Sequence, residues 1–123
     1  MIAQLTGSVA ELLSGQVVLD VGGVGFLLGV SATTVAQLPE QGSAGVTLYT
    51  RLLVRESAME LYGFSSRDER ALFDRLVAVS GVGPKLALAI LSAFTPATLA
   101  TIVRLQDASR LSQVPGVGRK KVQ

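Results

Sequence analysis

The 123-residue sequence contains no cysteine and no histidine. Their absence excludes disulfides, thiolate nucleophiles, imidazole bases, serine–histidine–aspartate triads and zinc sites built on cysteine or histidine. Aromatic residues are also scarce, at 5% of the chain, which leaves little material for stacking nucleic-acid bases. Apolar residues nevertheless reach 49%, so the chain can build a hydrophobic core in one medium domain or two small ones.

We expect no targeting segment at the start of this sequence, and no apolar run is uninterrupted. Its first six residues have neither a charged start nor a continuous apolar stretch. The most apolar window, Leu76–Phe94, is long enough to span a bilayer, but Gly81, Gly83 and Pro84 interrupt it near its middle. We therefore interpret this window as two short helices around a turn, and we expect a cytoplasmic protein.

Charge is divided unevenly between the two halves. Residues 1–63 carry two basic and five acidic side chains, a net charge of −3, whereas residues 64–123 carry nine basic and four acidic ones, a net charge of +5. A basic half favours polyanionic partners, although an excess of this size is modest evidence by itself.

The first half has the pattern of β-structure. Its short segments are rich in valine and leucine and are separated by glycines, and Gly22-Gly23 is a tight-turn signal between two of them. A flat sheet this small would leave unpaired edges, so five short strands predict a small closed barrel. The expected strands are Met1–Glu11, Gln16–Val21, Val24–Val30, Val46–Arg55 and Met59–Phe64, with a short helix or turn at Ser31–Leu38.

The second half changes to helical spacing after Phe64. We take this change as the domain boundary, which gives domains of residues 1–63 and 64–123. Ser66-Arg67-Asp68-Glu69 matches a capping box, in which the Ser66 hydroxyl accepts from the Glu69 amide and the Glu69 side chain reaches back. An apolar stripe at helical spacing then predicts the first helix.

Further helix signals follow. Pro84 and Pro96 suit the first turns of two more helices. Asp107 can cap a fourth helix, and a final helix is expected to begin near Gly118. Gln123 ends that helix after about one turn, which is too short to be stable alone. We therefore expect the chain to be part of a longer protein.

Two segments between helical patterns share the motif apolar-x-Gly-Val-Gly-x-Lys, offset by 35 residues. Two glycines allow positive φ and let a phosphate approach the backbone without a Cβ in the way. The following helix presents free N–H groups and the positive end of its dipole, and a lysine adds charge. Such a site holds a phosphate and reads no base, which predicts sequence-independent binding. The segments are Val79-Ser80-Gly81-Val82-Gly83-Pro84-Lys85 and Val114-Pro115-Gly116-Val117-Gly118-Arg119-Lys120.

Other interpretations of the motif are weaker. Gly-x-Gly between helices can be merely a tight connection, but a repeated motif argues against this. The first copy is not a P-loop, because it lacks the glycine–lysine–serine or threonine ending. It is not a dinucleotide fingerprint either, since Leu86 takes the position of the third glycine and a helix, not a strand, precedes it.

These motifs, in this order and spacing, resemble the RuvA family, which binds Holliday junctions in the bacterial branch-migration complex. The resemblance implies a β barrel plus an all-α domain: a five-stranded OB-fold in residues 1–63 and a tandem helix-hairpin-helix domain in residues 64–123, truncated at its C-terminus. From the resemblance, we expect the family's third domain to lie outside this chain. The resembling segments are Val21–Phe26, Leu38–Glu40, Val54–Glu56, Leu61–Phe64, Gly81–Ala89 and Val114–Gly118.

The resemblance further implies a non-catalytic protein that binds four-way junctions selectively and holds them open and square, in recombination and repair. It implies no catalytic residue, cofactor or metal ion. The DNA phosphates are expected at Ser80, Gly81, Gly83 and Lys85 of the first motif and at Gly116, Gly118, Arg119 and Lys120 of the second. Val122 stands where the family usually has alanine, which is expected to loosen the second hairpin.

The family also carries acidic residues in a β-turn called the acidic pin. Glu56 matches the first of them, and Arg55 is a candidate to flank the DNA. Ser57 stands where a second acid is common, so the pin has about half the usual charge. Glu60 is not assigned to the pin from sequence.

The partners implied are a homotetramer, alone or face to face with a second tetramer, a RuvB-type motor ATPase that docks on the missing domain, and a RuvC-type resolvase, with no membrane. Two alternatives remain. One is a helix-hairpin-helix glycosylase or nuclease, for which Asp107 is the acidic residue near the hairpins and has no partner close in sequence. The other is a protein-interaction module without DNA affinity.

Overall fold

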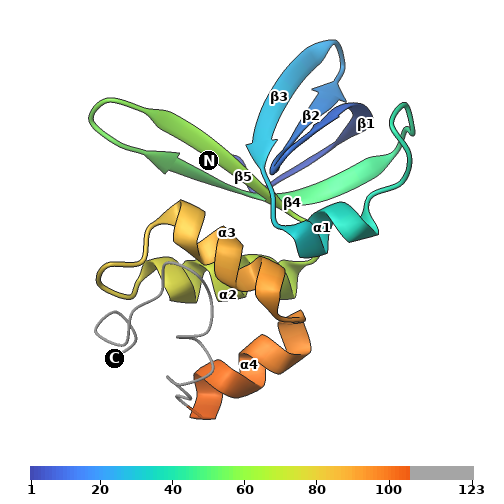
Figure 1. Cartoon of the computed structure of the whole chain (residues 1–123). Coiled ribbons are helices and arrows are strands. Elements are labelled where there is room, and N and C mark those ends of the chain that lie inside the picture. The colour runs from blue at the N-terminus through green and yellow to red at the C-terminus, as the bar shows by residue number, and fades with distance from the viewer. Residues whose placement is uncertain (106–123) are drawn as a thin grey trace. The chain divides into compact units, whose positions relative to one another are not determined.

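A computed structural model of the chain describes residues 1–105, of which Pro96 and residues 102–105 are described by their backbone alone. The chain divides into two compact units, one up to Arg70 and one from Ala71 onward. The first unit contains the strands of the described residues and helix α1 (Figure 1). Helix α2 starts in the first unit and ends in the second.

The strands of the first unit form a closed barrel in the order β1-β2-β3-β5-β4, with β4 pairing back on β1. Neighbouring strands are antiparallel except β3 and β5, which are parallel. This arrangement confirms the predicted five-stranded barrel, and the segment after β3 is a helix. The elements are β1 Gln4–Leu13, β2 Gln16–Val21, β3 Val24–Gly29, α1 Ala32–Gln37, β4 Val46–Val54 and β5 Met59–Phe64.

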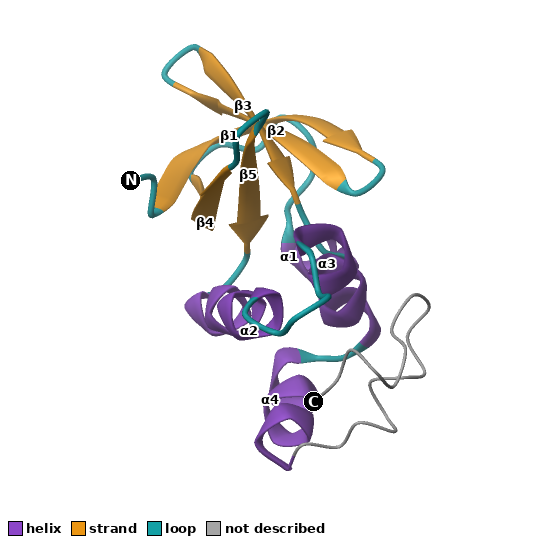
Figure 2. Ribbon diagram, turned by 90° about the vertical axis from the view of Figure 1, so that its left-hand side faces the viewer, coloured by secondary structure: helices purple, strands orange, loops and turns teal. Residues whose placement is uncertain are grey.

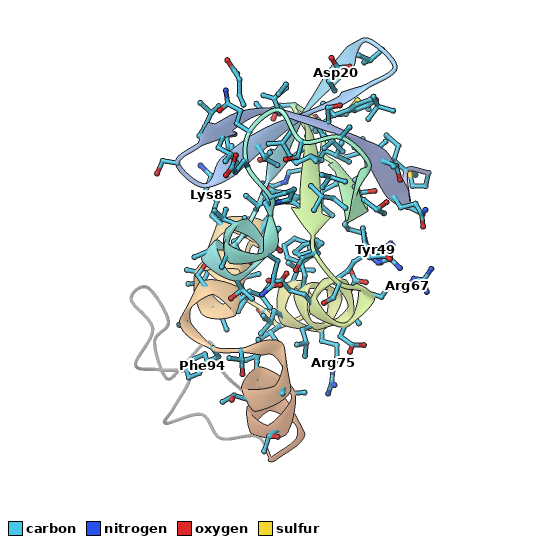
Figure 3. All side chains as sticks on the ribbon, turned by 90° about the vertical axis from the view of Figure 1, so that its right-hand side faces the viewer. Asp20, Tyr49, Arg67, Arg75, Lys85 and Phe94 are labelled. Atoms are coloured by element: carbon cyan, nitrogen blue, oxygen red, sulfur yellow. The ribbon has the colours of Figure 1, made fainter. Side chains whose placement is uncertain are left out.

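Gly22 and Gly23 join β2 to β3 in a two-residue turn, as the sequence predicts. Both have positive φ, +60° and +94°, which is the requirement of the type I′ turn that matches strand twist. The Gly23 N–H also donates to Asp20 Oδ1 at 2.8 Å, and Figure 3 labels Asp20 in this hairpin. The turn residues therefore fix the register of β2 on β3.

The barrel is filled by inward-facing aliphatic side chains from alternate strand positions. Six of them are buried: Val9, Val17, Leu19, Leu28, Val30 and Leu48. Partly buried residues pack around this cluster, among them Leu5 on β1 and Leu61 on β5. The pattern of alternation read from the sequence thus produces one continuous core.

The first turn of α2 (Arg67–Val77) corrects one expectation. The Ser66 hydroxyl accepts from the Glu69 N–H at 3.1 Å, as the capping box predicts. The Glu69 side chain does not reach back. It is fully buried and accepts from the Ser31 hydroxyl at 2.5 Å and from the Thr34 hydroxyl. Those two hydroxyls, at the start of α1, offer the carboxylate two donors in place of one backbone N–H.

The second unit is helical. After the end of α2 it contains α3 (Pro84–Ala93) and α4 (Pro96–Leu105), and the two prolines open these helices as predicted (Figure 2). The Leu76–Phe94 window is indeed divided by a turn, and among residues 1–105 no helix is long and apolar enough to cross a membrane. The helices expected at Asp107 and near Gly118 lie outside the described residues. Among the side chains that the structure describes in this unit, the buried ones are Leu72, Phe73, Leu76, Val82, Ala87, Ile90, Leu91 and Leu99.

Candidate nucleic-acid interface

The first glycine motif, residues 79–85, forms a tight turn between α2 and α3, which we call the first hairpin. The Val82 N–H donates to the Val79 carbonyl at 3.0 Å, which closes the turn. Gly81, the third residue of this turn, has a φ of +84°, a left-handed value that favours glycine. The Val82 side chain is only 7% exposed, so it anchors the turn in the helical unit, as the sequence suggests.

Gly83 does not adopt the positive φ that a glycine allows. Its φ is −87° and its ψ is 177°, an extended conformation that any residue can adopt. A Cβ added at Gly83 would meet nothing within 4 Å. Neither the backbone conformation nor the neighbouring atoms therefore require glycine here. Because glycine has no side chain, a ligand can approach the main chain from outside.

The start of α3 leaves backbone donors unused. The Ala87 N–H donates to the Gly83 carbonyl at 2.9 Å, which is the first bond of the helix. Pro84, at the first helical position, has no N–H. Among the described residues, the N–H groups of Gly83, Lys85 and Leu86 have no acceptor. Three main-chain donors are thus available at one helix end, the arrangement that binds anions.

Side-chain charge adds to the positive helix end. The first turn of α3 contains no acidic residue, and the exposed Lys85 lies in it. A cation at this position opposes the helix dipole and costs stability. Helix α2 follows the opposite, stabilising rule, with Asp68 and Glu69 in its first turn and Arg75 in its last. The charges at the start of α3 therefore favour binding of an anionic ligand, at some cost to the stability of the helix.

The exposure of the first hairpin agrees with this arrangement. Ser80, Gly81, Gly83 and Lys85 are all exposed, and they lie within six consecutive residues. The residues expected in the second hairpin, Gly116, Gly118, Arg119 and Lys120, lie outside the described residues, and so does Val122. The structure thus brings together the first predicted set.

The hairpin of β4 and β5 ends in a two-residue turn made by Glu56 and Ser57 (Figure 1). Arg55 and Ala58 close it, with the Arg55 N–H donating to the Ala58 carbonyl at 2.7 Å and the Ala58 N–H donating back at 3.4 Å. All four residues are exposed. Glu56 therefore occupies a projecting turn, as the sequence predicts.

Behind this turn, Glu60 contacts two side chains that sequence reasoning did not connect to it. Arg55 Nη2 lies 3.1 Å from Glu60 Oε1, and the Tyr62 hydroxyl donates to Glu60 Oε2 at 3.0 Å. The pKa of Tyr62 is raised to about 12, first by burial and then by the hydrogen bond to Glu60 and the negative charge of Glu60, while Arg55 lowers it. Alternation along β5 puts Glu60 and Tyr62 on one face, which is the signal that could have found the pair.

The comparisons with known proteins agree with this fold. Residues 1–63 match the family model described as the RuvA N terminal domain, and residues 73–123 match the model of a SAM-like helix-hairpin-helix tandem. The chain belongs to the RuvA family. The barrel is therefore the OB-type barrel expected for RuvA, and the hairpin between α2 and α3 falls within the matched helix-hairpin-helix region.

Curated relatives carry the name "Holliday junction branch migration complex subunit RuvA". Those from Chromobacterium violaceum, an Anaeromyxobacter species and Pseudomonas savastanoi are 51%, 52% and 50% identical to this chain over 120 residues. Each alignment covers 98% of this chain but 60%, 60% and 59% of the relative. The chain thus spans about three fifths of the length of these RuvA relatives.

Tyr49 lies on β4 of the RuvA barrel, and its aromatic ring could in principle stack a base. Its ring is covered by two guanidinium groups, with Arg67 at 5.1 Å and Arg70 at 5.8 Å from the ring centre (Figure 3). Arg70 is held in place because its Nη1 donates to the Ala3 carbonyl at 2.7 Å. The ring is therefore engaged in cation–π contacts within the first unit, which leaves it poorly placed to stack a base.

Proposed function

We propose that this chain binds four-way DNA junctions without catalysing a reaction, holds them open and square, and serves as the scaffold for an ATP-driven branch-migration motor in recombination and repair. Membership of the RuvA family supports this function, as do the names of the curated relatives. The observation that carries it in this molecule is the first hairpin, where unused N–H groups, an exposed lysine and open space at Gly83 lie together.

The proposed contacts in the first hairpin are to phosphates. Backbone N–H groups near Gly81 and Gly83 donate to phosphate oxygens, the Ser80 hydroxyl adds a donor, and Lys85 supplies charge. None of these groups reads a base edge, so binding is independent of sequence. By the repeat of the motif, a second phosphate site is formed by Gly116, Gly118, Arg119 and Lys120.

The β4–β5 turn supplies selectivity for the junction. Glu56 is a single exposed negative charge on a projecting turn, and it repels phosphates from the point where it stands. Four copies around an axis would keep the centre of a junction free of duplex. Arg55 flanks the DNA at the base of this turn without neutralising a phosphate, because its guanidinium pairs with Glu60.

The assembly we propose is a fourfold homotetramer, alone or as two tetramers face to face. Closed fourfold symmetry gives each arm of a four-way junction an equivalent protein surface. The further partners are a RuvB-type motor ATPase, bound through a C-terminal domain outside this sequence, and a RuvC-type resolvase. Because its substrate is a chromosomal DNA intermediate, the protein acts in the bacterial cytoplasm, and it needs no cofactor.

A gel-shift comparison of a four-way junction with a linear duplex of the same sequence tests the function. We expect the junction to bind more tightly than the duplex. Lys85→Glu should weaken junction binding by 10-fold or more for each first hairpin that contacts the DNA, on the order of 1.4 kcal/mol of binding free energy. Arg67→Glu makes the same change of charge outside the proposed site and is the matched control. Equal affinity for both DNAs, or equal effects of the two variants, would contradict the proposal.

A further inference from the structure

Two opposite charges stand next to each other in the β4–β5 turn. Arg55 carries one positive charge and Glu56 one negative charge, while Ser57 is neutral. Charges this close lie well within the Debye length of about 8–10 Å, so a phosphate approaching the turn experiences their sum. If the Arg55 guanidinium lay at the tip, it would cancel the charge of Glu56.

The structure holds the Arg55 side chain elsewhere. Its guanidinium pairs with Glu60, which lies on β5 behind the turn, at 3.1 Å. Arg55 is 52% exposed and Glu60 33% exposed, so this pair is accessible to solvent and to DNA. Glu60 therefore competes directly with any phosphate for the same guanidinium.

Glu60 is itself held in place. Its two carboxylate oxygens have separate tasks, since Oε1 faces Arg55 and Oε2 accepts from the Tyr62 hydroxyl at 3.0 Å. Tyr62 is only 5% exposed, so its hydroxyl is a fixed point on the barrel. The backbone of Glu60 is also fixed, because it is paired with Leu53 across the hairpin. A carboxylate that is already fixed binds a flexible arginine better than a mobile carboxylate does, because less conformational entropy is lost when the pair forms.

We propose that Glu60 is a positioning residue of the β4–β5 turn: it holds Arg55 back on the strand and so leaves Glu56 as the net charge of the tip. This inference rests on the proposed junction binding. Glu60 thus supplies a second negative charge, which acts from behind the turn. Ser57, at the tip, supplies none. When Glu60 loses its charge, Arg55 becomes free to bind phosphate, and the turn changes from repelling the backbone to attracting it.

The salt dependence of junction binding measures this change. Each phosphate neutralised adds a slope of about −0.9 to log K against log salt concentration. We expect Glu60→Gln to steepen the slope by about 0.9 for each Arg55 that gains a phosphate, and Glu60→Gln/Arg55→Gln to return it to the wild-type value. Glu40→Gln removes an equal charge from another exposed acid and should leave the slope unchanged.

A second readout reports the contact without DNA. The absorbance titration of Tyr62 should shift to lower pH in Glu60→Gln, and an unchanged titration would overturn the proposed contact. If the wild-type protein prefers the junction but Glu60→Gln gives the same salt slope as Glu40→Gln, only the role of Glu60 is refuted. If the wild-type protein binds a four-way junction no more tightly than a linear duplex, the proposed function is refuted as well.

Discussion

Replacing Glu69 by alanine is expected to destabilise the barrel unit far more than a surface substitution would. The Glu69 carboxylate is fully buried and accepts from the hydroxyls of Ser31 and Thr34. Each of those oxygens already accepts a backbone N–H, Ser31 from Thr34 at 3.0 Å and Thr34 from Ser65 at 3.0 Å. Their single protons therefore need an acceptor, and Glu69 is the acceptor that the fold supplies.

The size of the effect follows from these two bonds. A buried polar group that loses its partner costs about 1–3 kcal/mol, and Glu69→Ala leaves two such hydroxyls. Alanine also removes the cost of burying a carboxylate, which offsets part of the loss. We expect a net loss of about 2–4 kcal/mol, against a total stability of about 5–15 kcal/mol for a typical protein. Glu69→Gln keeps one acceptor oxygen and should cost about 1–2 kcal/mol.

Urea unfolding followed by the near-UV signal of tyrosine measures the loss. Tyr49 and Tyr62 are the chain's two tyrosines and both lie in the barrel unit, so the signal reports that unit. Asp68→Ala is the matched control, because this exposed neighbour in the same helical turn should cost only about 0.3–1 kcal/mol. Equal free energies of unfolding for Glu69→Ala and Asp68→Ala would refute the reasoning.

Three further predictions concern other residues. Gly7→Ala should destabilise the barrel by about 1–3 kcal/mol in urea unfolding, because an added Cβ would lie 2.1 Å from the Asp20 carbonyl oxygen. Tyr62 should ionise near pH 12; its raised pKa favours the neutral folded form, so the stability it contributes is complete below pH 10 and is lost as the pH rises toward 12. Gly81→Ala should cost about 1–2 kcal/mol because of its φ of +84°, whereas Gly83→Ala should leave stability unchanged and weaken junction binding in a gel shift.

Much of the fold could be predicted because its signals are local. The bounds of β2 and β5 agree with those expected from the sequence, and so does the Gly22-Gly23 turn. Each depends on alternation or turn chemistry within a few residues. The turn of the first hairpin was predictable for the same reason, since its glycines, proline and lysine lie within five consecutive residues.

What the sequence could not show depends on contacts between distant segments. Ser31 and Glu69 are 38 positions apart, so the local capping-box pattern gave the Glu69 carboxylate the wrong partner. The Arg55–Glu60 ion pair is closer in sequence, but it needed the register of β4 on β5, in which Val54 faces Met59. The motif alone also does not say which of its glycines has a positive φ, which is Gly81 and not Gly83.

We propose above all that the unused main-chain N–H groups at the start of α3 bind the phosphates of branched DNA. The most direct test is an amide NMR titration of the chain with a four-way junction. We predict that the N–H signals of Gly83, Lys85 and Leu86 shift most, while those of Gly22 and Gly23 in the β2–β3 turn stay in place. If the chain binds the junction but the N–H signals of Gly83, Lys85 and Leu86 do not shift, the proposed phosphate site is wrong.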